Sequence, residues 1–145
     1  MATGFQVTFD CADPDRVARF WASALRYKIQ DPPAGFDNWE AFLAAQGMPE
    51  SQWNSASAVV DPDGHGSRLY FQRVPEGKVV KNRVHLDLNV SGGRELPLEG
   101  RLDRIRSEQA RLIAEGAREI RPLGEENGEW WTVMQDVEGN EFCLQ

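Results

Sequence analysis

The sequence has few of the residues from which metal centres and disulfide scaffolds are built. Its 145 residues include only two cysteines and two histidines, and no two of these four lie near each other in the chain. A zinc site needs ligands clustered at short spacings, so the sequence contains no zinc motif. Cys11 and Cys143 lie in or beside strand patterns, which favours two small buried apolar residues in a reducing compartment.

Excess positive charge and long apolar runs are also missing. The formal net charge is −7, which argues against nucleic acid or an anionic membrane surface as the main partner. No basic amino-terminal region precedes an apolar stretch, and no apolar run is long enough to cross a membrane. The expected location is the cytoplasm. A chain of this length with 41% hydrophobic residues can bury one core, so a single domain over residues 1–145 is expected.

What the chain does contain is one order of elements used twice. Each half has a strand of alternating apolar and polar residues, then a helix, then an Asp-x-acid-Gly turn before a last strand. These elements are Phe5–Asp10, Pro14–Leu25, Asp61–Gly64 and Leu69–Arg73, and then Val84–Asn89, Arg101–Glu115, Asp136–Gly139 and Glu141–Leu144. Duplicated half-sheets that curl toward each other enclose one pocket. The repeat therefore predicts a shared cavity.

Hydrophobic spacing identifies the packed faces of both helices. Asp13 is the expected N-cap of the first helix, with Pro14 at its first position. Its apolar stripe is Val17, Phe20, Trp21, Ala24 and Leu25. The stripe of the second helix is Leu102, Ile105, Leu112 and Ile113.

Further strands are expected between these elements. They cover Tyr27–Gln30, Ala56–Val60, Ala117–Pro122 and Glu129–Gln135. Residues 83–90 alternate strictly, with Val84, Leu86, Leu88 and Val90 on one face and His85, Asp87 and Asn89 on the other. The total is eight strands and two principal helices in two βαβββ modules, which is an α+β fold. Module one covers about residues 5–74, the linker 75–82 and module two 83–145.

Residues 34–56 have no counterpart in the second half. Trp39, Phe42 and Leu43 share one face of a short helix that Gly47 would end, and Trp53 follows. Such a concentration of aromatic residues outside the repeat has two interpretations, namely packing that seals an open end or a lid over a ligand pocket.

Three segments resemble one known family. They are Ala12–Trp21, Arg83–Leu88 and the ending Asp136–Phe142. In this order and spacing the chain resembles the vicinal oxygen chelate superfamily, of the glyoxalase/bleomycin resistance protein/dioxygenase type. The resemblance covers residues 5–145 and implies two βαβββ modules forming a curved, partly open barrel-like sheet around one cavity. It also implies a monomer or a homodimer.

The resemblance also identifies positions where relatives hold a divalent cation. Gln6 and His85 correspond to each other in the repeat, and strand four offers Gln72 or Tyr70. Cys143 stands where relatives carry a glutamate, which is the main departure from the family pattern.

The charge of these side chains argues against a typical metal site. A hard cation generally needs one or two carboxylates, and the corresponding set has none, although Asp87 and Glu141 are near it in sequence. No cofactor is therefore expected. The alternative is a divalent metal held by Gln6, Gln72, His85 and Glu141.

These positions give the candidate site. The catalytic candidates are His85, Asp87 and Glu141, although a buried structural histidine remains open for His85. The ligand-binding candidates are Gln6, Thr8, Tyr70, Gln72, Cys143, Trp39 and Trp131, with Thr132 and Met134 as alternatives on strand seven. The expected function is binding of a small organic molecule in the cavity, with catalysis undecided and without a typical metal. The alternatives are a metal-dependent lyase, isomerase or dioxygenase, and a protein that sequesters an antibiotic or aromatic compound.

Overall fold

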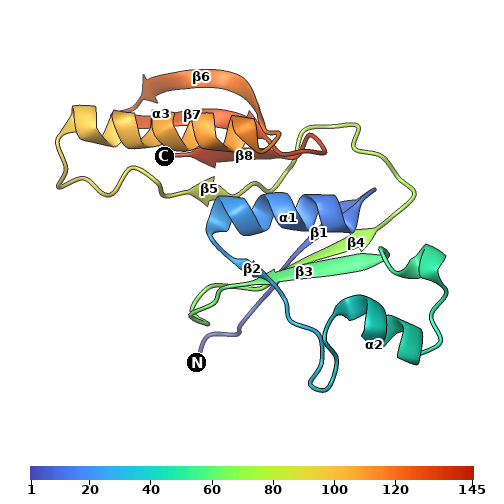
Figure 1. Ribbon diagram of the computed structural model, residues 1–145. Coiled ribbons are helices and arrows are strands. Elements are labelled where there is room, and N and C mark those ends of the chain that lie inside the picture. The colour runs from blue at the N-terminus through green and yellow to red at the C-terminus, as the bar shows by residue number, and fades with distance from the viewer. The chain divides into compact units, whose positions relative to one another are not determined.

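The chain folds into two compact units whose boundary lies in the predicted linker. The computed structural model describes residues 1–145, and these divide into Met1–Gly77 and Lys78–Gln145. Each unit holds one four-stranded sheet with a helix packed on one face (Figure 1). The α+β class is as predicted. The two βαβββ modules are also as predicted, and each forms a four-stranded sheet that is not closed.

The first unit contains a mixed sheet and the predicted insertion. Its elements are β1 (Val7–Cys11), α1 (Pro14–Leu25), β2 (Lys28–Ile29), α2 (Trp39–Ala45), a 3₁₀ turn (Glu50–Gln52), β3 (Ala56–Val60) and β4 (Leu69–Arg73). The strand order is β1-β4-β3-β2, with β1 parallel to β4 and the other pairs antiparallel.

The second unit repeats this topology. Its elements are β5 (Asp87–Leu88), α3 (Leu98–Ala114), β6 (Arg118–Glu126), β7 (Glu129–Gln135) and β8 (Glu141–Leu144). The order β5-β8-β7-β6 and the parallel β5–β8 pair match the first unit element by element. The duplication predicted from sequence is therefore confirmed in the topology.

Helix α1 has the predicted bounds and packed face. The Asp13 side chain accepts a hydrogen bond from the Arg16 N–H at 3.2 Å, which caps the first turn. Trp21 is fully buried, and its ring centroid lies 5.1 Å from that of Phe9, which in turn lies 5.2 Å from Phe71. This aromatic layer joins the helix to β1 and β4.

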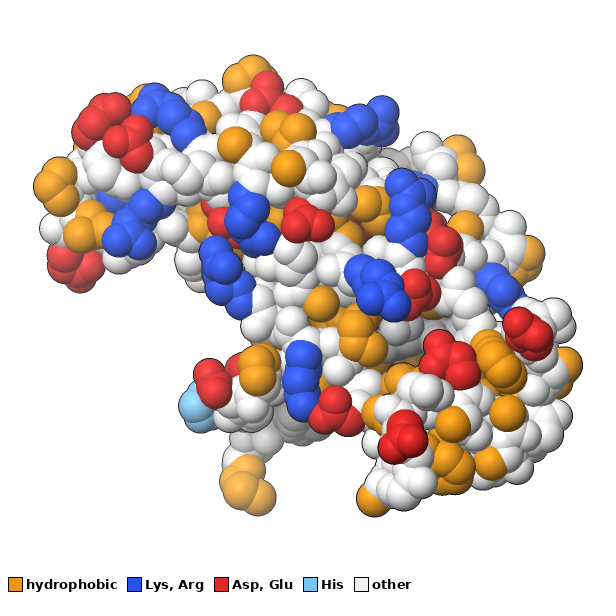
Figure 2. Space-filling view, viewed as in Figure 1, with side chains coloured by type: hydrophobic (Ala, Val, Ile, Leu, Met, Phe, Trp, Pro, Cys, Tyr) orange, Lys and Arg blue, Asp and Glu red, His pale blue; other side chains and the backbone are white.

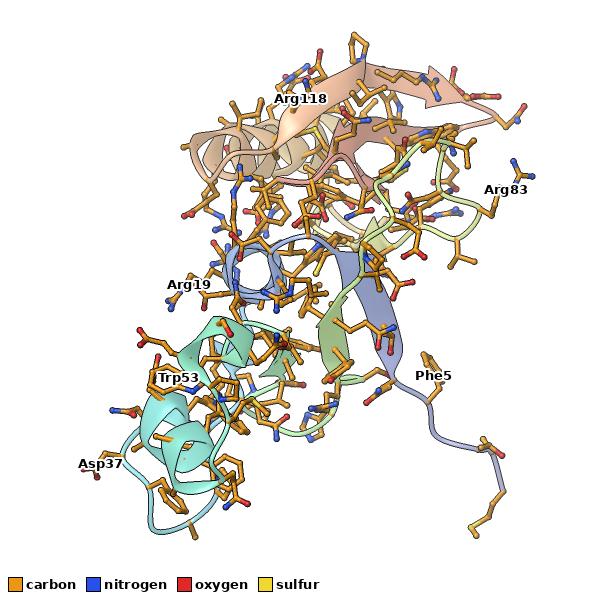
Figure 3. The ribbon with its side chains drawn as sticks, turned by 90° about the vertical axis from the view of Figure 1, so that its right-hand side faces the viewer. Phe5, Arg19, Asp37, Trp53, Arg83 and Arg118 are labelled. Carbon is orange, nitrogen blue, oxygen red and sulfur yellow. The ribbon has the colours of Figure 1, made fainter.

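Two predicted strands are shorter than the sequence pattern indicated. β1 begins at Val7, and Phe5 lies 74% exposed on the tail before it (Figure 3). β5 covers only Asp87–Leu88, and Val84, predicted to be buried, is 81% exposed. The Arg83 side chain projects outward nearby (Figure 3). β5 is an edge strand paired only with β8, so alternation alone could not fix where pairing begins.

Helix α3 and strand β6 also differ from the predicted bounds. α3 begins at Leu98, three residues before the predicted Arg101. The sequence pattern missed this first turn because the turn is exposed and carries no apolar stripe. Ile113, expected on the packed face, is 46% exposed, while Gln109 is buried. β6 continues past the predicted Pro122 to Glu126, with register shifts around that proline. None of the helices is long and apolar enough to span a membrane.

The two isoleucines of α3 make a matched test of this packing. Ile105 is 1% exposed and Ile113 is 46% exposed. We expect Ile105→Ala to lower the free energy of unfolding by about 2–5 kcal/mol, because it leaves a cavity in the core. Ile113→Ala should change it by less than about 1 kcal/mol. Urea denaturation of both variants measures the difference, and equal losses would show that the helix presents another face to its sheet.

Candidate functional site

The face of the first sheet opposite α1 carries the polar residues predicted to line a cavity. The β1–β4 register pairs Thr8 with Tyr70 and Asp10 with Gln72, while the apolar residues between them pack toward α1. Gln6 joins this face through a 3.5 Å hydrogen bond from its amide to the Thr8 hydroxyl. Four of the five predicted ligand-binding residues of this unit thus share one face, and the fifth is Trp39. Their role stays a prediction.

The Gln6 carbonyl on this face is already engaged by an arginine. Its oxygen accepts a hydrogen bond from Nη1 of Arg68 at 2.8 Å, and the Gln30 side-chain oxygen accepts one from Nε at 2.7 Å. The guanidinium carbon lies 5.2 Å from the centre of the Tyr70 ring. A cation held by Gln6 would lie beside this positive charge and be repelled by it.

Trp39 lies in the insertion, where its contacts are local. Its indole N–H donates to the Gln30 carbonyl at 2.6 Å, and its ring packs edge-to-face on Phe42 at 5.8 Å. No residue of α2 is buried, and hydrophobic side chains gather on the surface over this segment (Figure 2). Trp53, in the same insertion, lies close to α2 (Figure 3). Both interpretations of the segment, seal and lid, stay open.

In the second unit, the β5–β8 pairing brings three chemically active side chains together. Asp87 pairs with Cys143 in parallel register, and His85 stands two residues before Asp87. The Nδ1 atom of His85 lies 2.9 Å from a carboxylate oxygen of Asp87. One potential ligand atom from each of the three residues lies within 4.8 Å of the others. Three predicted site residues therefore form one cluster.

The Cys143 thiol of this cluster is neutral near pH 7. Burial raises the pKa of Cys143, and the charge and hydrogen bond of Asp87 raise it further, to about 11, although the positive charges of Lys81 and Arg121 act in the opposite direction. The side chain is thus a weak hydrogen-bond donor and not a thiolate at neutral pH.

Glu141 lies on the same strand face, but its carboxylate is held elsewhere. It forms an ion pair with Lys78 at 3.0 Å and accepts the Asn82 N–H at 2.9 Å. Although burial raises the pKa of Glu141, these two partners bring it down to about 2. An acid this strong is a poor general base near neutral pH. The contacts favour a structural role in which Glu141 fixes residues 78–82, and the catalytic role stays a prediction.

Trp131 is the β7 residue that shares the face of the cluster. Val133 pairs with Cys143, and Trp131 lies two residues away on the same side of β7. The alternatives Thr132 and Met134 are fully buried on the opposite side, where Gln109 of α3 reaches the Thr132 hydroxyl. The guanidinium carbon of Arg121 lies 4.6 Å from the centre of the Trp131 ring, a cation–π arrangement.

Three basic residues next to these predicted positions were missed from the sequence. Arg68 lies immediately before β4, Arg121 lies within β6, and Lys81 precedes β5. Arg121 could have been identified from the sequence, because it is a charged residue inside a predicted strand. Nothing in the sequence placed Lys81 near Cys143.

The residues present do not fit a hard divalent cation. The Gln6 carbonyl is bonded to a guanidinium, Glu141 is paired with Lys78, and the Cys143 thiol keeps its proton. The remaining donors are a histidine, one aspartate and a thiol, which suit zinc after the thiol ionises better than magnesium or manganese.

The comparisons with known proteins assign the family. The sequence matches the glyoxalase-like domain family over residues 6–145, and the chain belongs to that family. It is thus a member of the vicinal oxygen chelate superfamily, as the sequence motifs predicted. No curated protein sequence matches the chain.

Solved structures with the same fold are distant in sequence. A glyoxalase/bleomycin resistance protein/dioxygenase family enzyme from Burkholderia phytofirmans is 14% identical, with a TM-score of 0.62 over 96% of this chain and 94% of that one. A variant of the fosfomycin resistance protein FosX from Listeria monocytogenes, complexed with Mn(II) and 1S,2S-dihydroxypropylphosphonic acid, is 9% identical. Its TM-score is 0.63, over 100% of this chain and 90% of that one. Likenesses at this identity show the fold alone.

The pKa of Cys143 predicts its reactivity. With a pKa of about 11, roughly one thiol in a thousand is ionised at pH 8, so alkylation by iodoacetamide should be slow and should accelerate up to pH 11. Asp87→Asn should make the reaction faster at pH 8, because it removes the charge and hydrogen bond that disfavour the thiolate. Mass spectrometry of the alkylated protein over time measures the alkylation rate.

A Cys11→Ser background isolates Cys143 for this measurement. A rate that reaches its plateau below pH 9, or that Asp87→Asn leaves unchanged, would contradict the assigned environment of the thiol.

Proposed function

We propose that this glyoxalase-like protein binds a small organic molecule against the polar face of its second sheet, without a hard divalent cation. The observation that carries the proposal is the cluster of His85, Asp87 and Cys143 within 4.8 Å, on the strand face that also carries Trp131. A few convergent polar groups beside an aromatic surface are what a small-molecule site requires.

The cluster offers directional hydrogen bonds and one proton-transfer group. When His85 is neutral, donation from Nδ1–H to Asp87 leaves Nε2 as an acceptor. Cys143 adds an S–H donor. If the bound molecule reacts, His85 is the general acid or base and Asp87 orients its ring.

Trp131 and Arg121 add a flat binding surface. The guanidinium lies over the indole ring at 4.6 Å, and such a pair stacks well with planar conjugated molecules. Both groups are half-buried, so part of their surface remains open to a ligand. These features favour an aromatic or conjugated compound. The FosX complex supports the proposal in that the same fold holds a small polar organic molecule in that protein.

A second candidate function uses the same cluster as a soft-metal site. The mutual distances below 4.8 Å would allow one zinc ion to be bound by nitrogen, oxygen and sulfur. Binding would have to displace the thiol proton, so metal affinity would rise with pH. A zinc content of about one per chain that falls on His85→Ala would favour this candidate and its lyase, isomerase or dioxygenase chemistry over metal-free binding.

The adjacent tryptophans of β7 supply a matched test. A screen of aromatic and conjugated compounds against protein purified without added metal identifies a ligand, and calorimetric titration measures its affinity. We expect Trp131→Ala and His85→Ala to weaken binding about tenfold or more, because each removes a direct contact. Trp130→Ala, on the opposite face of the same strand, should leave the affinity within about twofold.

Equal losses for the two tryptophan variants would contradict this location of the site. So would a ligand whose binding depends on added metal.

A further inference from the structure

Arg68 is held in place by neutral groups alone. Its Nε donates to the side-chain oxygen of Gln30 and its Nη1 to that of Gln6, at 2.7 and 2.8 Å. The Tyr70 ring lies against the guanidinium at 5.2 Å. No carboxylate lies within ion-pairing distance, and the residue is half-buried.

Arg68 has no ion pair although the chain is strongly acidic. There are 23 acidic residues for 16 basic ones, so carboxylate partners are abundant. Several other basic side chains take them: Arg19, Lys28, Lys78, Arg94, Arg106, Arg111 and Arg121. Arg68 instead has amide oxygens and an aromatic ring, which orient the guanidinium and leave its charge uncompensated.

The donors of Arg68 are not used up by these contacts. A guanidinium carries five N–H groups in a fixed plane, and the two glutamines accept from two of them. The remaining N–H groups match the spacing of two oxygens on a carboxylate or a phosphate. Because the partners hold the plane, little conformational entropy is lost when such an anion binds.

We propose that Arg68, oriented by Gln6, Gln30 and Tyr70, is an anion-binding subsite on the first sheet for small molecules that carry a carboxylate or phosphate group. The subsite goes beyond the proposed function, because it lies in the first unit and its occupant is defined by negative charge. It also assigns Gln6 the role of orienting the Arg68 guanidinium. This position, which precedes β1 and was expected to supply a metal ligand, instead orients a group that binds negative charge.

Three simple probes test the subsite in the full-length protein. Benzoate, phenyl phosphate and the neutral benzamide share one ring and differ in the group they present. We expect saturable shifts of the backbone amide signals of Gln6, Gln30 and Arg68 in NMR titrations with at least one anion, and none with benzamide at the same concentration. The anion with the higher affinity identifies the preferred group. Added salt should weaken binding.

Variants on one strand separate a specific subsite from general attraction. Arg68→Gln should weaken anion binding about tenfold or more, since it removes the charge-assisted bonds. Arg68→Lys keeps the charge without the planar fork and should bind with intermediate affinity. The control is Arg73→Gln, because Arg73 lies on the opposite side of β4 by register and also has only neutral partners, in Ser51, Gln52 and Ser55. It should bind like the unaltered protein.

Equal losses for Arg68→Gln and Arg73→Gln, or no saturable anion binding at all, would overturn the proposal. Its failure is separable from that of the proposed function. Anion binding that depends on Arg68 supports the subsite even if Trp131→Ala leaves the affinity for the screened ligand unchanged, in which case the proposed function alone fails.

Discussion

The parallel pairing of β5 with β8 is the constraint on which the candidate site depends. The Cys143 N–H donates to the Leu86 carbonyl at 3.0 Å, and the Gln145 N–H donates to the Leu88 carbonyl at 3.0 Å. These bonds fix the register that sets Asp87 beside Cys143. A slip of one residue would turn both side chains into the α3 layer, where Leu88 and Leu144 now pack. The backbone hydrogen bonds between β5 and β8 thus hold the side chains of Asp87 and Cys143 next to each other.

The same topology supports different chemistry in the first unit. β1 and β4 pair in parallel as β5 and β8 do. The sequence repeat matches Gln6 to His85, and therefore Thr8 to Asp87. There the polar face is organised around Arg68, with amide and hydroxyl groups in place of imidazole, carboxylate and thiol. Duplication conserved the scaffold and the face, while the two copies acquired side chains of opposite electrostatic preference. The residues that the sequence resemblance linked to a metal, Gln6 among them, therefore do not form a ligand set for a hard cation.

Much of the fold was predictable because it depends on local signals. The Asp13-Pro14 start and the apolar stripe of α1 gave that helix its observed bounds, and alternation placed Gln6, Thr8, Tyr70 and Gln72 on one face. The errors arose at positions whose burial depends on whether another element of the fold covers them. Val84 and Ile113 fit their apolar patterns, yet one precedes an edge strand and the other lies at the end of a helix stripe, where no partner element covers them. The β7–β8 register was needed to decide whether Trp131 or its neighbours Thr132 and Met134 share a face with Cys143.

For the candidate site, the sequence could predict which residues take part but not their chemistry, because partners distant in sequence set their charge and hydrogen bonds. Glu141 was a plausible base until Lys78 and Asn82 were seen to hold its carboxylate. The acidity of Cys143 depends on burial and on Asp87, far from it in sequence. No motif indicates that Arg68 meets two glutamine amides.

The central claim is that the cluster on β5 and β8 binds its ligand through proton-bearing groups and without a metal. Nitrogen-15 chemical shifts of the His85 ring, in protein purified without added metal, test this directly, with His65→Ala to assign the signals. The account predicts a ring protonated at Nδ1 toward Asp87, an unprotonated Nε2 when neutral, and spectra that a chelator leaves unchanged. A ring nitrogen signal that shifts when a chelator is added, and returns with zinc, would contradict it.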